Sequence, residues 1–421
     1  MSSIEITVQG LGSGGVGIGS LANGKVVFLP RTAPGDRVRI RIVKEKTRWA
    51  LGEPVEWLDH GEGRRPPPCP RYEECSGCSM QHLEYVQQIK WKARFVGDAL
   101  RRIGKLDVSD PEIVASPHEV RYRNRVSFTL RRLPGDRVVA GFREHLRKGR
   151  VLDLGPECLL PEEPLSELWR GLRAGWGPNA KLLPGGRELR LNLRTGRLGG
   201  GLTIKGGQGD GNPQRLLSEV EGLSSIWRED REGSLRHVAG EPELPVLWAG
   251  EEIHLGGAGF TQVNPGAGEL LYAHILSQTS TLKKARIVDG YCGIGVLGRA
   301  MARLGNEVVG IDIHPNSEGA DFDEGSFRVV KGRVEAELAR ALPADLVLLN
   351  PPRTGVDPTV CSVLTESPVP RIIYVSCDPG TLGRDLERMK TGYTIRGVRS
   401  FDLFPQTEHV ETVVSLEGQT S

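Results

Sequence analysis

The sequence predicts an α/β protein in which a doubly wound, Rossmann-like domain follows two smaller N-terminal parts. The chain has 421 residues, more than a single hydrophobic core usually holds, so two or three domains are expected. From Ala285 onward, short apolar runs alternate with helical patterns, as a doubly wound domain requires. Residues 4–58 instead consist of short strand patterns separated by glycine and proline turns, which predicts a small β-barrel.

The predicted barrel contains one strand with alternating chemistry, RVRIRIV at residues 37–43. Side chains alternate across a strand, so Val38, Ile40 and Ile42 can face a core while Arg37, Arg39 and Arg41 share the opposite face. Three guanidinium groups on one face would suit a phosphate backbone. The formal net charge is only +2, but basic residues outnumber acidic ones in residues 25–48 and 87–150, which suggests a polyanionic partner.

Residues 59–255 are predicted to form a central α+β domain. GEGRRPPPCP, residues 61–70, is too rich in Pro and Gly to form an element and is typical of a domain edge. Residues 82–103 have helical spacing and a basic face, and this helix could pack on the C-terminal domain. Two strand patterns flank Pro134-Gly135, and the Gly-rich residues 198–212 are interpreted as a mobile hairpin region.

Four cysteines of this central part form a candidate metal site: Cys69, Cys75, Cys78 and Cys158. Seven cysteines in a long chain favour metal binding or catalysis over a disulfide framework. Four thiolates can hold a tetrahedral zinc ion or a [4Fe-4S] cluster. Three of the cysteines lie close together in the sequence and the fourth is distant, whereas zinc sites typically have two CxxC pairs. We therefore favour an iron-sulfur cluster, with zinc as the alternative.

The C-terminal domain, predicted for residues 256–421, opens its α/β pattern with a glycine turn. Residues 285–315 predict a strand, the turn, a helix and a second strand that ends in Asp312. Gly293 and Gly295 let the backbone come close to a ligand, and Asp312 could accept both ribose hydroxyls of a nucleotide. Asp289, ahead of the turn, fits S-adenosylmethionine better than NAD.

Two later strands of this domain end in reactive or polar groups. DLVLLNPPR, residues 345–353, places the amide of Asn350 at a strand end, in the crevice where a base or cofactor could bind. RIIYVSCDPGTLGRDL, residues 371–386, places Cys377 between a strand and a helix for which Thr381 is the expected N-cap. The helix dipole would favour the thiolate there, although most free cysteines are only small buried hydrophobes.

The C-terminal run FDLFPQTEHVETVVSL contains a candidate base. His409 and Glu411 are two positions apart, so their side chains share a face if the segment is extended. A carboxylate there could accept a proton, whereas a glutamate taken alone is more often solvated.

Together these motifs resemble the RNA uracil-C5 methyltransferase family. The resemblance covers almost the whole chain: a barrel like a TRAM domain (an OB-like RNA-binding barrel), the four cysteines, FTQVNP (260–265), DGYCGIG, NPPR, VSCDPGTLGRDL and FPQTEHVE. It implies a [4Fe-4S] cluster, a nucleophile at Cys377 and a proton acceptor at Glu411. It also implies cofactor or uracil contacts from Gln262, Tyr291, Asp312 and Asn350.

The implied reaction explains why a thiol is needed. C5 of uracil is a poor nucleophile, and attack of the Cys377 thiolate at C6 would activate C5 to take the methyl group of S-adenosylmethionine. Glu411 would then remove the C5 proton. The target uridine must be flipped or unpaired, so the expected partner is a transfer or ribosomal RNA. We expect a cytoplasmic protein without a membrane segment, and no protein partner is evident from the sequence.

Three departures from the family pattern leave alternatives open. Asn350 stands where the family usually has Asp, Arg333 where an acid commonly approaches the adenine, and residues 314–327 look short for the usual helix. Asn-Pro-Pro also opens the motif of adenine-N6 methyltransferases, but these need an aromatic residue where this chain has Arg353. The second alternative is an RNA-binding iron-sulfur protein that has lost catalysis.

Overall fold

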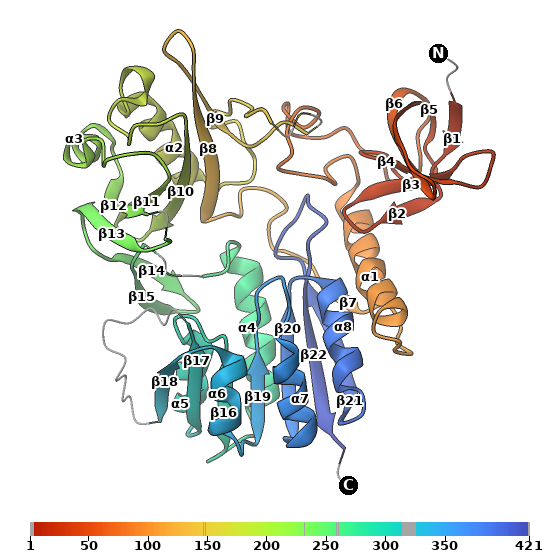
Figure 1. The fold of residues 1–421 in the computed structure, drawn as a ribbon, viewed down its shortest axis with the longest axis vertical. Coiled ribbons are helices and arrows are strands. Elements are labelled where there is room, and N and C mark those ends of the chain that lie inside the picture. Colours follow the sequence, from red (N-terminus) through yellow and green to blue (C-terminus); the bar gives the residue numbers. More distant parts are fainter. Residues whose placement is uncertain are drawn as a thin grey trace.

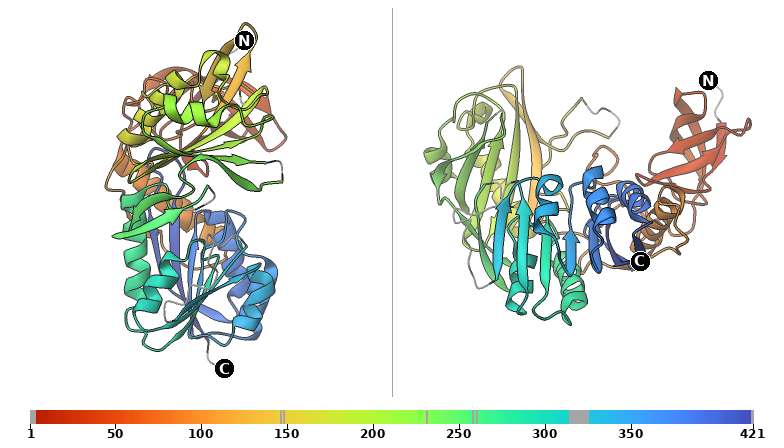
Figure 2. Two further views of the ribbon diagram at one scale, coloured as in Figure 1. Left: turned by 90° about the vertical axis from the view of Figure 1, so that its left-hand side faces the viewer. Right: turned by 60° about the horizontal axis from the view of Figure 1, so that its bottom comes forward.

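The computed structural model describes residues 4–145, 147, 149–230, 232–257, 259, 261–313 and 326–419. Three β-sheets form three bodies: an N-terminal barrel, a central sheet and a C-terminal sheet (Figure 1). The central sheet stacks above the C-terminal sheet along the long axis, and the barrel stands to one side of both (Figure 2).

The N-terminal body is a six-stranded sheet in the order β1-β5-β6-β4-β3-β2. Its strands are β1 (Ile4–Thr7), β2 (Gly10–Gly12), β3 (Val16–Ser20), β4 (Val26–Leu29), β5 (Arg37–Glu45) and β6 (Trp49–Asp59). Val38 and Ile40 of β5 are buried in its core, as the alternation in the sequence predicts, while Ile42 is only partly buried against it.

The arginine face of β5 differs from the expectation of a free basic surface. Each of its arginines pairs with a carboxylate of a neighbouring strand: Arg37 with Asp59 at 3.1 Å, Arg39 with Glu5 at 3.0 Å and with Glu56, and Arg41 with Glu53. The sequence of β5 alone did not show these partners, because they come from β1 and β6. The face is therefore a row of surface ion pairs with little net charge to offer a phosphate.

Helix α1 (Tyr85–Arg102) and strand β7 (Glu112–Val114) precede the central sheet in sequence but lie in the C-terminal body. Helix α1 packs against α8 (Pro379–Met389), and β7 pairs in parallel with β21 (Tyr393–Phe401) at the sheet edge. The chain thus visits the C-terminal body before it builds the central sheet.

The central sheet has six strands in the order β13-β12-β11-β10-β8-β9. They are β8 (Arg125–Leu133), β9 (Arg137–Gly141), β10 (Glu188–Gly196), β11 (Gly199–Lys205), β12 (Leu223–Glu229) and β13 (Leu235–Gly240). Helices α2 (Glu163–Gly175) and α3 (Pro213–Glu219), with the 3-10 turn η1 (Pro178–Ala180), cover one face and complete an apolar core. The other face stays open toward a cavity.

In the expected mobile hairpin region, 198–212, β11 forms a hairpin with β10 but is an interior strand, held between β10 and β12. Leu202 and Ile204 are buried there. The glycines allow close packing: a Cβ at Gly200 would stand 2.3 Å from Leu168 of α2. The Gly-rich composition reflects a helix lying tightly on the strand.

The C-terminal body is an eight-stranded sheet in the order β18-β17-β16-β19-β20-β22-β21-β7. Its other strands are β16 (Arg286–Gly290), β17 (Glu307–Asp312), β18 (Phe327–Lys331), β19 (Leu346–Leu349), β20 (Arg371–Ser376) and β22 (Glu411–Gly418). Helices α4 (Pro265–Thr279) and α5 (Val296–Arg303) pack on one face; α1, α6 (Val334–Ala341), α7 (Pro358–Glu366) and α8 pack on the other. The hairpin β14 (Leu244–Trp248) and β15 (Glu251–Leu255) joins the central and C-terminal bodies.

The parallel strands of this sheet determine where a ligand can bind. The strand order reverses at β16, which lies between β17 and β19. In open α/β sheets the ligand crevice forms at such a point, beyond the carboxyl ends of the strands. In the described part of the chain, no helix is long and apolar enough to cross a membrane.

Candidate functional site

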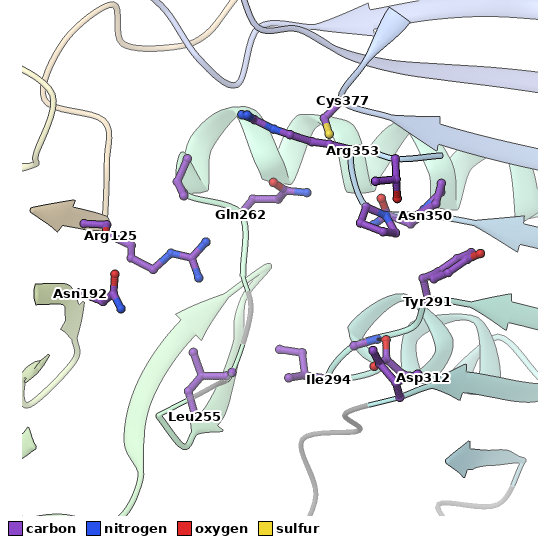
Figure 3. A pocket seen from close by; sticks show the side chains of 18 of the residues that line it. Arg125, Asn192, Leu255, Gln262, Tyr291, Ile294, Asp312, Asn350, Arg353 and Cys377 are labelled. Carbon is purple, nitrogen blue, oxygen red and sulfur yellow. Dashed lines mark hydrogen bonds between the residues drawn. The ribbon is translucent and has the colours of Figure 1, made fainter. Parts of the chain in front are cut away.

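A large cavity of about 1430 Å³ lies between the carboxyl ends of the C-terminal sheet and the open face of the central sheet. All but one of the residues predicted to bind the cofactor or catalyse the reaction line its C-terminal side: Gln262, Tyr291, Gly293, Asp312, Asn350, Cys377 and Glu411. Figure 3 shows several of them facing Arg125 and Asn192 of the central sheet across the cavity.

The glycine turn after β16 forms one corner of the cavity. The backbone N–H of Gly293 donates to Asp312 Oδ2 at 2.9 Å, which ties the turn to the end of β17. Tyr291 and Gly293 both have positive φ, and no atom lies within 4 Å of a Cβ built on Gly293, so this side of the turn is open to a ligand. Gly295 is the exception and does not line the cavity: its own Cβ would stand 2.6 Å from the ring of Phe327.

Asn350 and Gln262 reach the cavity from two other elements. The N–H of Asn350 donates to the carbonyl of Gly290 at 3.2 Å, which holds the end of β19 beside the end of β16. Gln262 is buried in the segment before α4. Asn264 caps that helix, accepting from Ala267 N–H and donating to Ser116 Oγ at 2.9 Å, and so fixes the segment.

The side chains of this corner are of the kinds that could hold a nucleoside. Asp312 supplies a carboxylate at the end of the second strand, and Ile294 and Val334 supply apolar walls. An acidic residue, Glu335, lies two positions after Arg333. Glu335 is only partly exposed and lines the cavity, whereas Arg333 is largely solvent-exposed and pairs with Glu335 at 3.2 Å. Of the segment 314–327, which was expected to be short, residues 314–325 lie outside the described residues.

Cys377 follows the last residue of β20 directly, at the carboxyl edge of the sheet. The cap of the following helix differs from the expectation: α8 begins at Pro379, and Asp378 is the N-cap, accepting from Thr381 N–H at 2.8 Å. A carboxylate is as good a cap as a threonine hydroxyl, and proline is favoured at the first helical position. The thiol is therefore closer to the helix than the predicted cap would place it.

The ionisation of Cys377 also differs from the expectation of a thiolate. Burial raises the pKa of the thiol to about 11, and the nearby carboxylate of Glu411 acts in the same direction, while Arg353 opposes both. The helix terminus alone does not outweigh the loss of water around the sulfur. The thiol is mainly protonated at neutral pH in the free protein.

Glu411 lies beside Cys377 because of the strand register. β20 and β22 are antiparallel, and Ser376 pairs with Thr412, so the two residues that follow and precede them come together at the sheet edge. Glu411 is 5% exposed. Burial raises its pKa to about 8, and Arg353 lowers it. The alternative of a solvated glutamate is wrong.

Arg353 and His409 form a polar group next to this pair. Arg353 Nη2 and His409 Nε2 are 3.3 Å apart, and both side chains line the cavity. His409 precedes β22 and packs its ring against Phe404. Arg353 is a site residue that the sequence indicated only as a mismatch to another motif. The signal in the sequence that could have identified Arg353 is its position directly after two prolines at the end of a strand.

The four candidate cluster cysteines lie away from this cavity but together. Cys69, Cys75, Cys78 and Cys158 line one small cavity with the rings of Tyr72 and Phe142. Burial raises the pKa of Cys78 and of Cys158 to about 12. Among the described residues, no three His, Cys, Asp or Glu side chains are placed to hold a metal ion. The four thiols thus share one small apolar cavity, and both metals of the sequence prediction stay open here.

Comparisons with known proteins agree with this arrangement. Residues 327–419 match the family model described as tRNA (Uracil-5-)-methyltransferase, and residues 2–55 match the TRAM domain model. An uncharacterized RNA methyltransferase of Synechocystis is 32% identical to this chain, in an alignment that covers 99% of this chain and 96% of the relative. One from Thermosynechococcus vestitus is 31% identical, covering 99% and 98%.

A solved structure supports the fold over nearly the full length. The crystal structure of Pyrococcus abyssi tRNA (uracil-54, C5)-methyltransferase in complex with S-adenosyl-L-homocysteine has a TM-score of 0.74 and 23% identity. It covers 98% of this chain and 99% of its own. The relatives above show that the chain belongs to a family of RNA methyltransferases, and its N-terminus carries a TRAM domain.

Proposed function

We propose that this protein methylates C5 of a uridine in RNA, with S-adenosylmethionine as the methyl donor. One observation carries the proposal: the thiol of Cys377 and the carboxylate of Glu411 meet at the edge of one cavity, beside the glycine turn and Asp312. A nucleophile, a base and a nucleotide-binding corner thus share one space.

The roles of the residues follow from their positions. Asp312, Tyr291 and the turn at Gly293 would hold the cofactor, which supplies an electrophilic methyl group when bound. Gln262 and Asn350 would orient the uracil by hydrogen bonds from their side-chain amides. Arg353 lies near both reactive groups, where its charge favours the ionised forms of Cys377 and Glu411.

The chain's own groups carry the covalent steps. Cys377 loses its proton to water and its sulfur adds to C6, which moves the electrons of the C5–C6 double bond into an enolate. C5 would then bond to the methyl carbon of the bound cofactor as that carbon's bond to the donor sulfur breaks. Glu411 takes the proton from C5, the double bond re-forms, and the C6–S bond breaks to release the Cys377 thiolate. A pKa near 8 suits a base that must be ionised for this last step at mildly alkaline pH.

We also include in the proposal that Cys69, Cys75, Cys78 and Cys158 hold one [4Fe-4S] cluster with a structural role. Their shared apolar cavity supports this. The RNA is expected to be a transfer or ribosomal RNA.

The test uses the order of the chemical steps. Glu411→Gln should still attack C6 and methylate C5 but then stall, so a covalent protein–RNA complex carrying the labelled methyl group should accumulate on ordinary uridine RNA. Cys377→Ala should form no complex, and Cys361→Ala, which removes a buried thiol of α7, should behave like the parent protein. The measurement is denaturing gel electrophoresis with methyl-labelled cofactor. Normal turnover by Cys377→Ala would refute the mechanism.

A further inference from the structure

The open face of the central sheet forms the wall of the cavity opposite Cys377 (Figure 3). Its side chains come from alternate positions of four adjacent strands: Arg125 and Ser127 of β8; Arg190, Asn192 and Arg194 of β10; Gly201 and Thr203 of β11; Ser225 and Trp227 of β12. None of these residues is acidic. The intervening residues point the other way, into the core under α2 and α3. We call this wall the central-sheet face.

Two arginines of the central-sheet face lie directly opposite each other. Arg194 of β10 pairs in register with Arg125 of β8. Like charges in directly opposed positions destabilise a sheet. The Nη1 atom of Arg194 is buried and has no hydrogen-bond partner among the described residues. Burial and the charge of Arg125 lower the pKa of Arg194 to about 9. A buried guanidinium N–H without a hydrogen-bond partner costs stability, and an anion bound at Arg194 Nη1 would relieve that cost.

The surroundings of Arg194 leave room for such an anion. On its other side, Arg194 is in register with Gly201, which has no side chain. Next along the strands, Asn192 lies between Ser127 and Thr203, so hydrogen-bonding groups continue the face. Arg190 Nε donates to Ser127 Oγ at 2.7 Å, which orients the hydroxyl.

An aromatic ring stands at the other end of the face. Trp227 is in register with Thr203, and its indole N–H donates to Ser225 Oγ at 3.0 Å. The backbone of Gly257 packs on the ring so closely that a Cβ there would stand 2.6 Å from it. The indole is therefore held in one orientation at the cavity wall. Fixed aromatic rings beside arginines are how many proteins stack and hold unpaired nucleotides.

We infer that the central-sheet face binds the single-stranded RNA that flanks the reacting uridine. Arg125 and Arg194 take a phosphate of that strand, and Trp227 stacks a neighbouring base. This inference rests on the proposed function, because a uridine that reaches Cys377 brings its flanking nucleotides past this wall. RNA is favoured over a protein segment because guanidinium groups and an indole on a non-acidic face match phosphates and bases together.

The test measures RNA binding without chemistry. All variants are made in a Cys377→Ala background and bind a fluorescent single-stranded RNA containing uridine at several salt concentrations. Arg194→Gln should weaken binding and lower the slope of log K against log salt by about 0.7 for each phosphate that the variant no longer neutralises. Trp227→Ala should weaken binding by about fivefold or more without changing the slope, since stacking is uncharged. Arg170→Gln is the matched control: it lies on α2, behind the same sheet, and should change nothing.

Melting temperatures without RNA separate binding from folding. Arg194→Gln should melt at or above the temperature of its parent, because it removes a buried charge beside another of the same sign. A lower melting temperature for Arg194→Gln would overturn the inference. An unchanged RNA affinity and salt slope would also overturn it, and would indicate that the central-sheet face binds a protein partner instead. Failure of the proposed function would look different: the wild-type protein would transfer no methyl group to RNA, although RNA binding would still depend on Arg194.

Discussion

Glu411 combines burial with a neighbouring guanidinium, and the two act against each other. Its pKa is raised to about 8 by burial, although Arg353 pulls it down. A glutamate in an unfolded chain titrates near 4.5. Between these values the native protein holds a proton that the unfolded chain has released. Because the native state binds more protons, the free energy of unfolding falls as pH rises through this window.

Glu411→Gln should therefore become more stable relative to the parent protein as pH rises. The two proteins should differ least near pH 4.5, and the gain should grow up to about pH 8 by at most ~1.4 kcal/mol per pKa unit. Melting temperatures measured across this range check it. Glu417→Gln, exposed on the same strand and paired with Arg396, is the control and should show no such growth. A constant difference for Glu411→Gln would mean that the buried carboxyl is ionised throughout.

At the scale of single residues, the sequence motifs predicted where Cys377 and Glu411 lie, but they did not predict the ionisation state of the two side chains. Cys377 and Glu411 were identified from the ends of strand patterns and from family resemblance, and both line the cavity. The helix dipole expected to favour the Cys377 thiolate is opposed by burial of the sulfur and by the charge of a carboxylate from β22, both of which raise the pKa of the thiol. Such long-range neighbours leave no signal within a local motif.

Among the elements, helix α1 and the segment between β21 and β22 hold each other in place. Lys92 of α1 is fully buried and donates to Asp402 Oδ1 at 2.6 Å and to the carbonyl of Phe404 at 3.0 Å. Gln88, one turn earlier, exchanges hydrogen bonds with Gln406. This segment leads directly to His409 and Glu411, so α1 positions the proposed base from outside the cavity.

Lys92→Met should destabilise the protein by about 3–5 kcal/mol, because it leaves the carboxylate of Asp402 buried without its cation. The double variant Lys92→Met with Asp402→Asn should recover much of that loss by removing the charge. Lys90→Met, exposed on the same helix, should be nearly neutral. Urea unfolding of the three variants measures these differences. A Lys92→Met protein as stable as the parent would show that the ion pair contributes nothing.

The elements also show which parts of the fold the sequence could predict. Alternation in RVRIRIV predicts the buried side of β5, and the apolar runs predict the parallel strands. The partners of the β5 arginines and the interior position of β11 depend on neighbouring strands and on α2, which are distant in sequence. The local sequence pattern therefore predicts which face of a strand is buried, but it does not predict which strands lie beside it in the sheet.

On the scale of the whole molecule, the cysteine segment is the junction of the three bodies. Arg31 of the barrel donates to the carbonyl of Cys75 at 2.7 Å, and Arg121, ahead of the central sheet, donates to that of Cys158 at 2.9 Å. The N–H groups of Ser79 and Met80 both donate to the carbonyl of Gln406, each at 3.0 Å. A cluster held by these cysteines would fix the barrel, the central sheet and the segment that carries Glu411 relative to one another.

Protein purified without oxygen should therefore be brown, absorb near 400 nm and contain about four irons per chain, as expected for a [4Fe-4S] cluster. Cys158→Ser should lose the colour, whereas Cys292→Ser, in the glycine turn, should keep it. Because the cluster joins three bodies, its loss should also expose the segments between them, and limited proteolysis of Cys158→Ser should cut near residues 61–70 faster than in the parent. Colourless protein with one zinc per chain would replace the iron assignment by zinc. If the purified protein is colourless, contains no metal and is cut by the protease no faster than a coloured sample, then the packed side chains alone hold the junction together.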